Sequence, residues 1–199
     1  MNIEIVPAGD GDLAAVRNLA RFYVYDMSEF MGWPCSESGS FEGCDEFFGD
    51  WGNGRNSPYV IRVDGELAGF AGIKRDEGVR GGYLVQEFFI LRKFRRKGVG
   101  RNVATRLFDR FPGMWRVQQL VQNSPAIGFW REVIRDYTKG HFDESTERDP
   151  RWGDVNVIRF SNAYPRQGLR YPKQAFIPEQ GRKSGERYIA LHIAEIHHE

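Results

Sequence analysis

The most informative part of this chain is Glu87-Phe-Phe-Ile-Leu-Arg-Lys-Phe-Arg-Arg-Lys-Gly-Val-Gly-Arg101. An apolar run from Phe88 to Leu91 predicts the end of a strand, and the basic cluster after it contains two glycines. Beyond that cluster, apolar residues recur every three or four positions, which predicts a helix. Glycines let the backbone approach a ligand, and the N–H groups of a helix's first turn attract anions. The stretch therefore predicts an anion site that suits a pyrophosphate.

Four other interpretations of this turn stand beside that one. A Walker-type phosphate loop needs Gly-Lys-Ser/Thr, whereas Gly100 is followed by Arg101-Asn102. A dinucleotide fingerprint needs a third glycine at position 103, which is Val103. A nucleic-acid surface would explain the bases, but the chain carries a net charge of only +1 and its other bases are dispersed among acids. A solvated basic turn is the plain alternative. The bases in question are Arg92, Lys93, Arg95, Arg96, Lys97 and Arg101.

The segment 95–100 resembles the Gln/Arg-x-x-Gly-x-Gly/Ala element of the Gcn5-related N-acetyltransferases (GNAT). In that family the element lies between a strand and a helix and holds the pyrophosphate of coenzyme A. A second segment, Asn123-Ser-Pro-Ala-Ile-Gly-Phe-Trp130, resembles the family's Asn-x-x-Ala-x-x-Phe-Tyr helix opening. Ser124 is expected to cap that helix, and Pro125 suits its first turn. The resemblance implies that Asn123 contacts the coenzyme.

Trp130 departs from the family pattern, in which a tyrosine is placed to protonate the departing thiolate. An indole N–H donates hydrogen bonds but is no usable acid at neutral pH. Tyr137, Tyr25 and Tyr83 are alternative acids. A thiol with a pKa of about 8.5 can also leave as thiolate without an acid. The general acid is therefore unassigned.

The resemblance covers residues 1–161 and implies an α+β fold. That fold has a central mixed, mostly antiparallel twisted sheet, flanked by helices and splayed between its fourth and fifth strands. The sequence pattern agrees with it, because it predicts strands at 2–7, 83–91 and 115–121 and a hairpin at 59–73 that turns at Asp64-Gly65. Residues 140–142 and 155–160 are predicted to form a closing strand pair. A helix capped by Asp10 or Asp12 is also predicted, and its apolar positions are Leu13, Val16, Leu19, Ala20, Tyr23 and Met27.

The resemblance also implies the chemistry, which is attack of an amine on acetyl-CoA in a ternary complex. In the family, backbone N–H groups of the splayed strand face the thioester, and here they belong to Phe89, Ile90 and Leu91. Glu87 is the candidate base, because it interrupts an apolar strand where burial would raise the pKa of a carboxylate. A salt-bridged or solvent-facing glutamate is the alternative. The predicted coenzyme-binding residues are Phe89, Ile90, Leu91, Arg95, Arg96, Lys97, Gly98, Val99, Gly100, Arg101, Asn123 and Trp130.

The acceptor is predicted to be a small molecule with a primary amine. The segment after the first helix is rich in aromatic and acidic residues, which suit a cationic amine through charge and cation–π attraction. The same aromatics could instead form a satellite core with the acids on its wet face. These residues are Asp26, Glu29, Phe30, Trp33, Glu37, Phe41, Glu42, Asp45, Glu46, Phe47, Phe48, Asp50, Trp51 and Tyr59. His141 is a second base candidate or a hydrogen-bonded histidine.

The remaining features predict a cytoplasmic enzyme without metal, membrane or nucleic-acid partners. Cys35 and Cys44 lack zinc-site spacing and are expected to be free thiols. No apolar run approaches a membrane span, and the N-terminus lacks a signal pattern. His192, His197 and His198 are expected to be solvated rather than to bind metal. Residues 162–199 form an extension that is expected to pack on its own domain or to pair with a second subunit as a homodimer.

These observations predict an acetyl-CoA-dependent N-acetyltransferase. A non-catalytic acyl-CoA-binding sensor or scaffold of the same fold is the alternative, in which Trp130 marks a lost acid.

Overall fold

The computed structural model describes residues 1–41 and 56–163 of the 199-residue chain. Two short 3-10 helices, η1 (Asp10–Asp12) and η3 (Arg92–Phe94), precede α1 and α2. Within the described ranges the main elements are β1 (Ile3–Pro7), α1 (Leu13–Met31), β2 (Asn56–Val63), β3 (Glu66–Asp76), β4 (Gly82–Ile90), α2 (Val99–Arg110), β5 (Met114–Leu120), α3 (Ser124–Thr138), β6 (Asp143–Asp149) and β7 (Gly153–Ser161).

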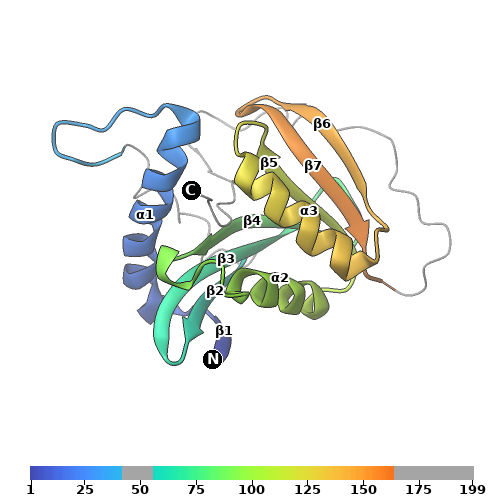
Figure 1. Cartoon of the computed structure of the whole chain (residues 1–199), viewed down its shortest axis with the longest axis horizontal. Helices are drawn as coiled ribbons and strands as arrows, with labels where there is room; N and C mark the ends of the chain where they lie inside the picture. Colours follow the sequence, from blue (N-terminus) through green and yellow to red (C-terminus); the bar gives the residue numbers. More distant parts are fainter. Residues whose placement is uncertain (42–55, 164–199) are drawn as a thin grey trace.

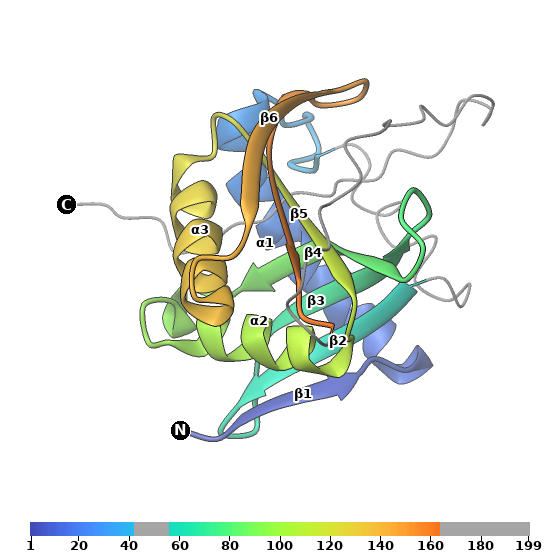
Figure 2. The ribbon, with the colours of Figure 1, turned by 90° about the vertical axis from the view of Figure 1, so that its right-hand side faces the viewer.

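The described strands form one sheet in the order β1-β2-β3-β4-β5-β7-β6. Neighbouring strands are antiparallel except β4 and β5, which are parallel and are joined by the crossover helix α2. Helices α2 and α3 cover one face of the sheet and α1 covers the other (Figures 1 and 2). The mixed, mostly antiparallel sheet with flanking helices confirms the predicted fold.

Local sequence signals place most of these elements. Asp64 and Gly65 join β2 to β3 with φ angles of 51° and 81°, as a two-residue hairpin turn of type I′ requires. Asp12 precedes α1 as predicted, but its carboxylate accepts a hydrogen bond from the N–H of Gly9 at 3.0 Å and caps no helical N–H. The predicted apolar face of α1 is confirmed by Tyr23 and Met27, both fully buried.

The prediction of a strand at residues 140–142 was wrong. These residues follow the end of α3, where Lys139 and Gly140 adopt φ angles of 58° and 84°, and the strand β6 begins only at Asp143. β6 lies at the edge of the sheet, and almost all of its side chains are polar and exposed. An edge strand of this kind shows no apolar alternation, so it could not be recognised from the residue pattern.

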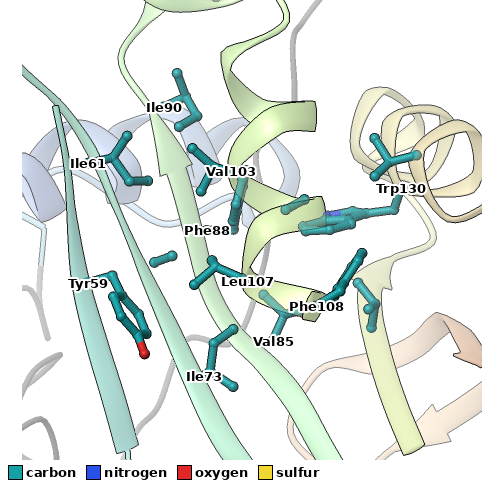
Figure 3. Packing of buried hydrophobic residues seen from close by; sticks show 14 of the residues in the cluster. Tyr59, Ile61, Ile73, Val85, Phe88, Ile90, Val103, Leu107, Phe108 and Trp130 are labelled. Carbon is teal, nitrogen blue, oxygen red and sulfur yellow. The ribbon is translucent and has the colours of Figure 1, made fainter. Parts of the chain in front are cut away.

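Two apolar clusters hold the helices on the sheet. The larger lies between the sheet and the pair α2 and α3, and it contains Phe88, Phe108 and Trp130 (Figure 3). The smaller lies beneath α1, where Tyr23 meets the rings of Phe70 and Phe89 edge-on with centroid distances of 5.9 Å. Sheet residues therefore face a different helix on each side, and β4 contributes to both clusters.

Candidate active site

The fourth and fifth strands separate partway along their length. They pair only from Gly82↔Met114 to Leu84↔Arg116. Beyond that point residues 85–90 of β4 and 117–120 of β5 diverge (Figure 1), and we call the opening between these two segments the split. Backbone N–H and C=O groups that face the split are not used by a neighbouring strand, so they can bind an extended ligand. The predicted splay is confirmed.

A β-bulge in β4 lies at the closed end of the split. The register of β4 against β3 passes over Gln86, which makes it the extra residue. Val85 and Phe88, on either side, both belong to the cluster under α2 and α3. Because side chains alternate along a strand, the two residues between them face the other side, toward α1. Gln86 and Glu87 are thus consecutive buried polar side chains on one face, 4% and 1% exposed.

The N–H groups of β4 point alternately to β3 and to the split. The N–H of Leu91 donates to the carbonyl of Ala68 at 2.8 Å, so it is used by β3. By alternation the N–H of Phe89 also points to β3 and that of Ile90 points to the split. The carbonyl of Ile90 agrees with this direction, because it accepts a hydrogen bond from Nε of Arg95 at 2.7 Å. Of the three N–H groups predicted to face a thioester, the geometry leaves that of Ile90.

The two glycines of the turn have different roles. Gly98 caps α2 with a φ of 78°, and a Cβ there would meet no atom within 4 Å, so only its backbone conformation requires glycine. A Cβ on Gly100 would lie 3.2 Å from Cζ of Phe129, so this glycine lets α2 pack against α3. The first α-helical bond of α2 runs from the N–H of Asn102 to Gly98 at 3.0 Å. The N–H groups of residues 99–101 therefore point out of the helix, as an anion site requires.

Two arginines of the turn bind one carboxylate on α1. Asp26 is 5% exposed and accepts hydrogen bonds of 2.7 Å from both Arg92 and Arg95. The hydrogen bond that Arg92 donates to the carboxylate of Asp26 raises the pKa of Arg92. Arg95 is buried too, and its guanidinium lies 5.5 Å from the ring centre of Phe89. The network ties α1 to the turn and, through Arg95, to the carbonyl of Ile90. Asp26 therefore has a structural role in α1, and it is not one of the acids expected to bind the acceptor amine.

The other bases of the turn differ in their exposure and in their acidic partners. Arg101 reaches α3, where it binds Asp136 at 2.7 Å and also Glu132. Lys93 pairs with Glu66 on β3. Arg96 and Lys97 are exposed, and Lys97 has no acidic partner in the described part of the chain. Ion pairs neutralise most of the basic cluster, which favours a small-anion site over a surface for a long polyanion.

Asn123 lies at the start of α3 and supplies its cap. Its Oδ1 accepts a hydrogen bond of 3.0 Å from the N–H of Ala126, and the residue is 1% exposed. The predicted cap, Ser124, is instead the first residue of the helix, while Pro125 lies in the first turn as predicted. Nδ2 of Asn123 lies 4.0 Å from Sδ of Met27, so Asn123 also joins α3 to α1. Its contact with a coenzyme stays a prediction.

Trp130 is a core residue of the α2 and α3 side. It is fully buried, and its ring lies 5.0 Å from that of Phe88 and 5.1 Å from that of Phe129 (Figure 3). These contacts give Trp130 a role in packing α3 against β4. Its contact with the coenzyme stays a prediction.

The three tyrosines considered as acids lie on three different elements. The hydroxyl of Tyr137 donates to Asp109 at 2.7 Å, and burial together with Asp109 raises its pKa to about 12. Tyr83 belongs to the paired, closed end of β4. Tyr25 is 61% exposed on α1. His141 is exposed after the end of α3, where its Nδ1 lies 2.9 Å from the carbonyl of Thr138.

The aromatic residues predicted to line the acceptor site pack into the two apolar clusters, as far as the structure describes them. Phe30, Trp33 and Phe41 lie against the cluster under α1, whereas Tyr59 belongs to the larger cluster. Cys35 is exposed with a free thiol. No group of metal-binding side chains and no helix long and apolar enough to cross a membrane occurs within residues 1–41 and 56–163. Glu29 and Glu37 are exposed. The predictions for Glu42, Asp45, Glu46, Phe47, Phe48, Asp50 and Trp51, for Cys44, for the extension and for His192, His197 and His198 fall outside the described residues.

Comparison with known proteins identifies the family. The model of the acetyltransferase (GNAT) family matches residues 20–133, more than half of the chain. The chain belongs to the GNAT family. It is therefore an N-acetyltransferase, and the split with its anion-binding turn is its candidate active site. No curated protein matches the sequence.

Solved structures share the fold of this GNAT protein at low sequence identity. The ribosomal-protein-S18-alanine N-acetyltransferase from Escherichia coli superimposes with a TM-score of 0.59 at 14% identity over 85% of this chain and 100% of its own. A chimera of the spermidine N-acetyltransferases from Vibrio cholerae and human gives 0.58 at 17% identity over 81% and 96%. An aminoglycoside acetyltransferase in complex with coenzyme A gives 0.57 at 15% identity over 81% and 95%.

Sequence reasoning missed Gln86 and gave Asp26 the wrong role, because it placed Asp26 among the acids of the acceptor segment. Asp26 lies three residues after Tyr23, so helical periodicity places it on the buried face of α1 and could have revealed it. Gln86 could not have been found in this way, because strict alternation would put it opposite Glu87. Only the bulge brings both side chains to the same face.

Proposed function

We propose that this enzyme transfers the acetyl group of acetyl-CoA to the primary amine of a small molecule, by direct attack in a ternary complex at the split. The observation that carries the proposal is the position of the split, which lies between the anion-binding turn and the buried Glu87. A donor substrate with a phosphate end and an extended arm fits the anion-binding turn and the split. An amine acceptor fits beside Glu87.

The residues present suit acetyl-CoA. The outward N–H groups at 99–101 and the exposed Lys97 would bind its pyrophosphate, and the unpaired edges of the split would bind the amides of its arm. When bound, acetyl-CoA supplies an activated acyl group. The N–H of Ile90 would stabilise the negative charge that develops on the acyl oxygen, a contribution of about 3 kcal/mol for one well-placed donor. Glu87 would accept the proton of the attacking nitrogen, directly or through water.

The burial of the polar pair supports a small acceptor. Gln86 and Glu87 are 4% and 1% exposed, so only a narrow group such as an amine on a flexible chain reaches them easily. Among the structural neighbours, the spermidine and aminoglycoside acetyltransferases are named for small amine substrates. The ribosomal-protein-S18-alanine N-acetyltransferase is named for a protein substrate. We place the reaction in the cytoplasm on the basis of the sparse cysteines.

The test measures thiol release from acetyl-CoA with a panel of acceptors: alkyl diamines, a polyamine, an aminoglycoside and a peptide with N-terminal alanine. We expect turnover with a small amine and a fall in kcat of about 10²- to 10⁴-fold in Glu87→Gln, with unchanged affinity for acetyl-CoA. Glu66→Gln, at an exposed ion pair on β3, is the matched control and should keep full activity. Turnover of the peptide alone would contradict the small acceptor. Full activity of Glu87→Gln would remove Glu87 as the base, and no turnover with any amine would contradict the proposed function.

A further inference from the structure

The bulge in β4 holds a buried amide whose oxygen has no hydrogen-bond partner among the described residues. Gln86 is 4% exposed, and its Oε1 has no hydrogen-bond partner within the part of the chain that the structure describes. The residue lies just beyond the last pair between β4 and β5, Leu84↔Arg116, at the closed end of the split. It faces α1, on the same side as Glu87 and next to it in the chain.

An amide oxygen in this position is costly unless a ligand uses it. A buried polar atom without a partner costs about 1–3 kcal/mol, and an apolar side chain of the same shape would avoid that cost. The buried Gln119 on β5 differs at its amide oxygen: its Oε1 accepts a hydrogen bond of 3.0 Å from Asn156, while its Nε2 has no partner among the described residues. Alternation with Val117 places Gln119 on the α2 and α3 side, so it serves the sheet. The oxygen of Gln86 is therefore a candidate to receive a hydrogen bond from the acceptor substrate.

We propose that Oε1 of Gln86 accepts a hydrogen bond from the acceptor amine beside Glu87, and thereby selects primary over secondary amines. This inference rests on the proposed function. A neutral primary amine carries two N–H bonds. One proton passes to Glu87 while the nitrogen lone pair forms the N–C bond, and the C–S bond breaks with its electrons leaving on the thiolate. The second N–H remains on the nitrogen and is held by Gln86 throughout.

A secondary amine cannot satisfy both groups. It has one N–H, which the reaction consumes at Glu87, so Gln86 would stay unpartnered and a methyl group would face its oxygen. A site built to hydrogen-bond a substrate N–H rejects an analogue that lacks it, because its own buried polar group is then left unpaired. Gln86 is thus a specificity-determining residue of the acceptor site.

The experiment compares wild type with Gln86→Met, which keeps the length of the side chain and removes the amide. Three quantities are measured for each: the thermal midpoint, the affinity for acetyl-CoA, and kcat/KM for the best amine of the panel and for its N-methyl derivative. We expect an equal or higher midpoint, unchanged acetyl-CoA affinity, and a fall in kcat/KM for the primary amine of about ten-fold. The preference for the primary over the N-methyl amine should shrink by the same factor. Gln119→Met is the matched control, expected to lower the midpoint and to leave that preference unchanged.

The outcomes separate the inference from the function on which it rests. A lower midpoint in Gln86→Met would show that the amide stabilises the fold, and an unchanged amine preference would show that it does not contact the acceptor. Either result overturns the inference while turnover by wild type upholds the proposed function. Absence of turnover in wild type, with acetyl-CoA still bound, overturns the proposed function and the inference together.

Discussion

The two faces of β4 are built for different purposes. Toward α2 and α3 the strand presents Val85, Phe88 and Ile90 to a cluster of aromatic rings. Toward α1 it presents Phe89 to the smaller cluster and, beside it, Gln86 and Glu87, two polar side chains that are buried just as deeply. Burial of apolar groups stabilises the fold, whereas buried polar groups cost stability unless they are partnered. The comparison teaches that residues 85–90 are wholly apolar on one face, whereas the other face joins the apolar Phe89 to two buried polar side chains, which we propose serve the chemistry.

The largest effect is expected on the apolar face. Trp130→Ala would remove a fully buried ring that packs against Phe88 and Phe129. Loss of a buried aromatic side chain costs about 4 kcal/mol of the free energy of unfolding. Urea denaturation followed by circular dichroism measures it, with Trp130→Phe as the conservative control. A loss below about 1 kcal/mol would mean that this face is not the main source of stability.

A smaller effect is expected where α1 is fastened to the turn. Asp26→Asn would leave the buried guanidinium of Arg95 without its counter-charge, which costs about 3 kcal/mol for a broken buried ion pair. Glu66→Gln removes an exposed pair and should cost less than about 1 kcal/mol. The two variants are compared by denaturation and by acetyl-CoA affinity, which Asp26→Asn should also weaken because Arg95 holds the turn. Equal stability of the two variants would show that burial of the Asp26 pair adds nothing.

The smallest effect is expected at the ion pair between β6 and β7, at the edge of the sheet. Hydrogen bonds from Arg159 on β7 lower the pKa of Glu147 on β6. A folded-state pKa below the unfolded value gives stability that is present above about pH 4.3 and is lost as the pH falls through the folded pKa. Arg159→Met should therefore cost less than about 1 kcal/mol at neutral pH and nothing in strong acid. Denaturation midpoints across this pH range measure it, and a cost that grows in acid would contradict the account.

Sequence and structure agree where a local rule decides the outcome. The hairpin at Asp64-Gly65, the apolar face of α1 and the glycine turn all follow from residues that are neighbours in the chain or at helical spacing. The sequence could not show which N–H of β4 is free, because that depends on the pairing of Leu91 with Ala68. Nor could it show that Arg95 turns inward to Asp26, a partner 69 residues away. The strand, turn and helix that carry the predicted site follow from the sequence, but which of their polar groups bind other protein groups depends on tertiary contacts.

The most direct test of the account is a calorimetric titration with acetyl-CoA of the wild-type protein and of Gly98→Asp. The substitution places a side chain and a negative charge at a φ of 78° in the anion-binding turn, on a surface with no neighbouring atoms to disturb. The account predicts saturable binding by wild type and its loss in Gly98→Asp. Equal binding by both proteins, or no binding by wild type at millimolar concentrations, would contradict the assignment of this turn and the split to the donor substrate.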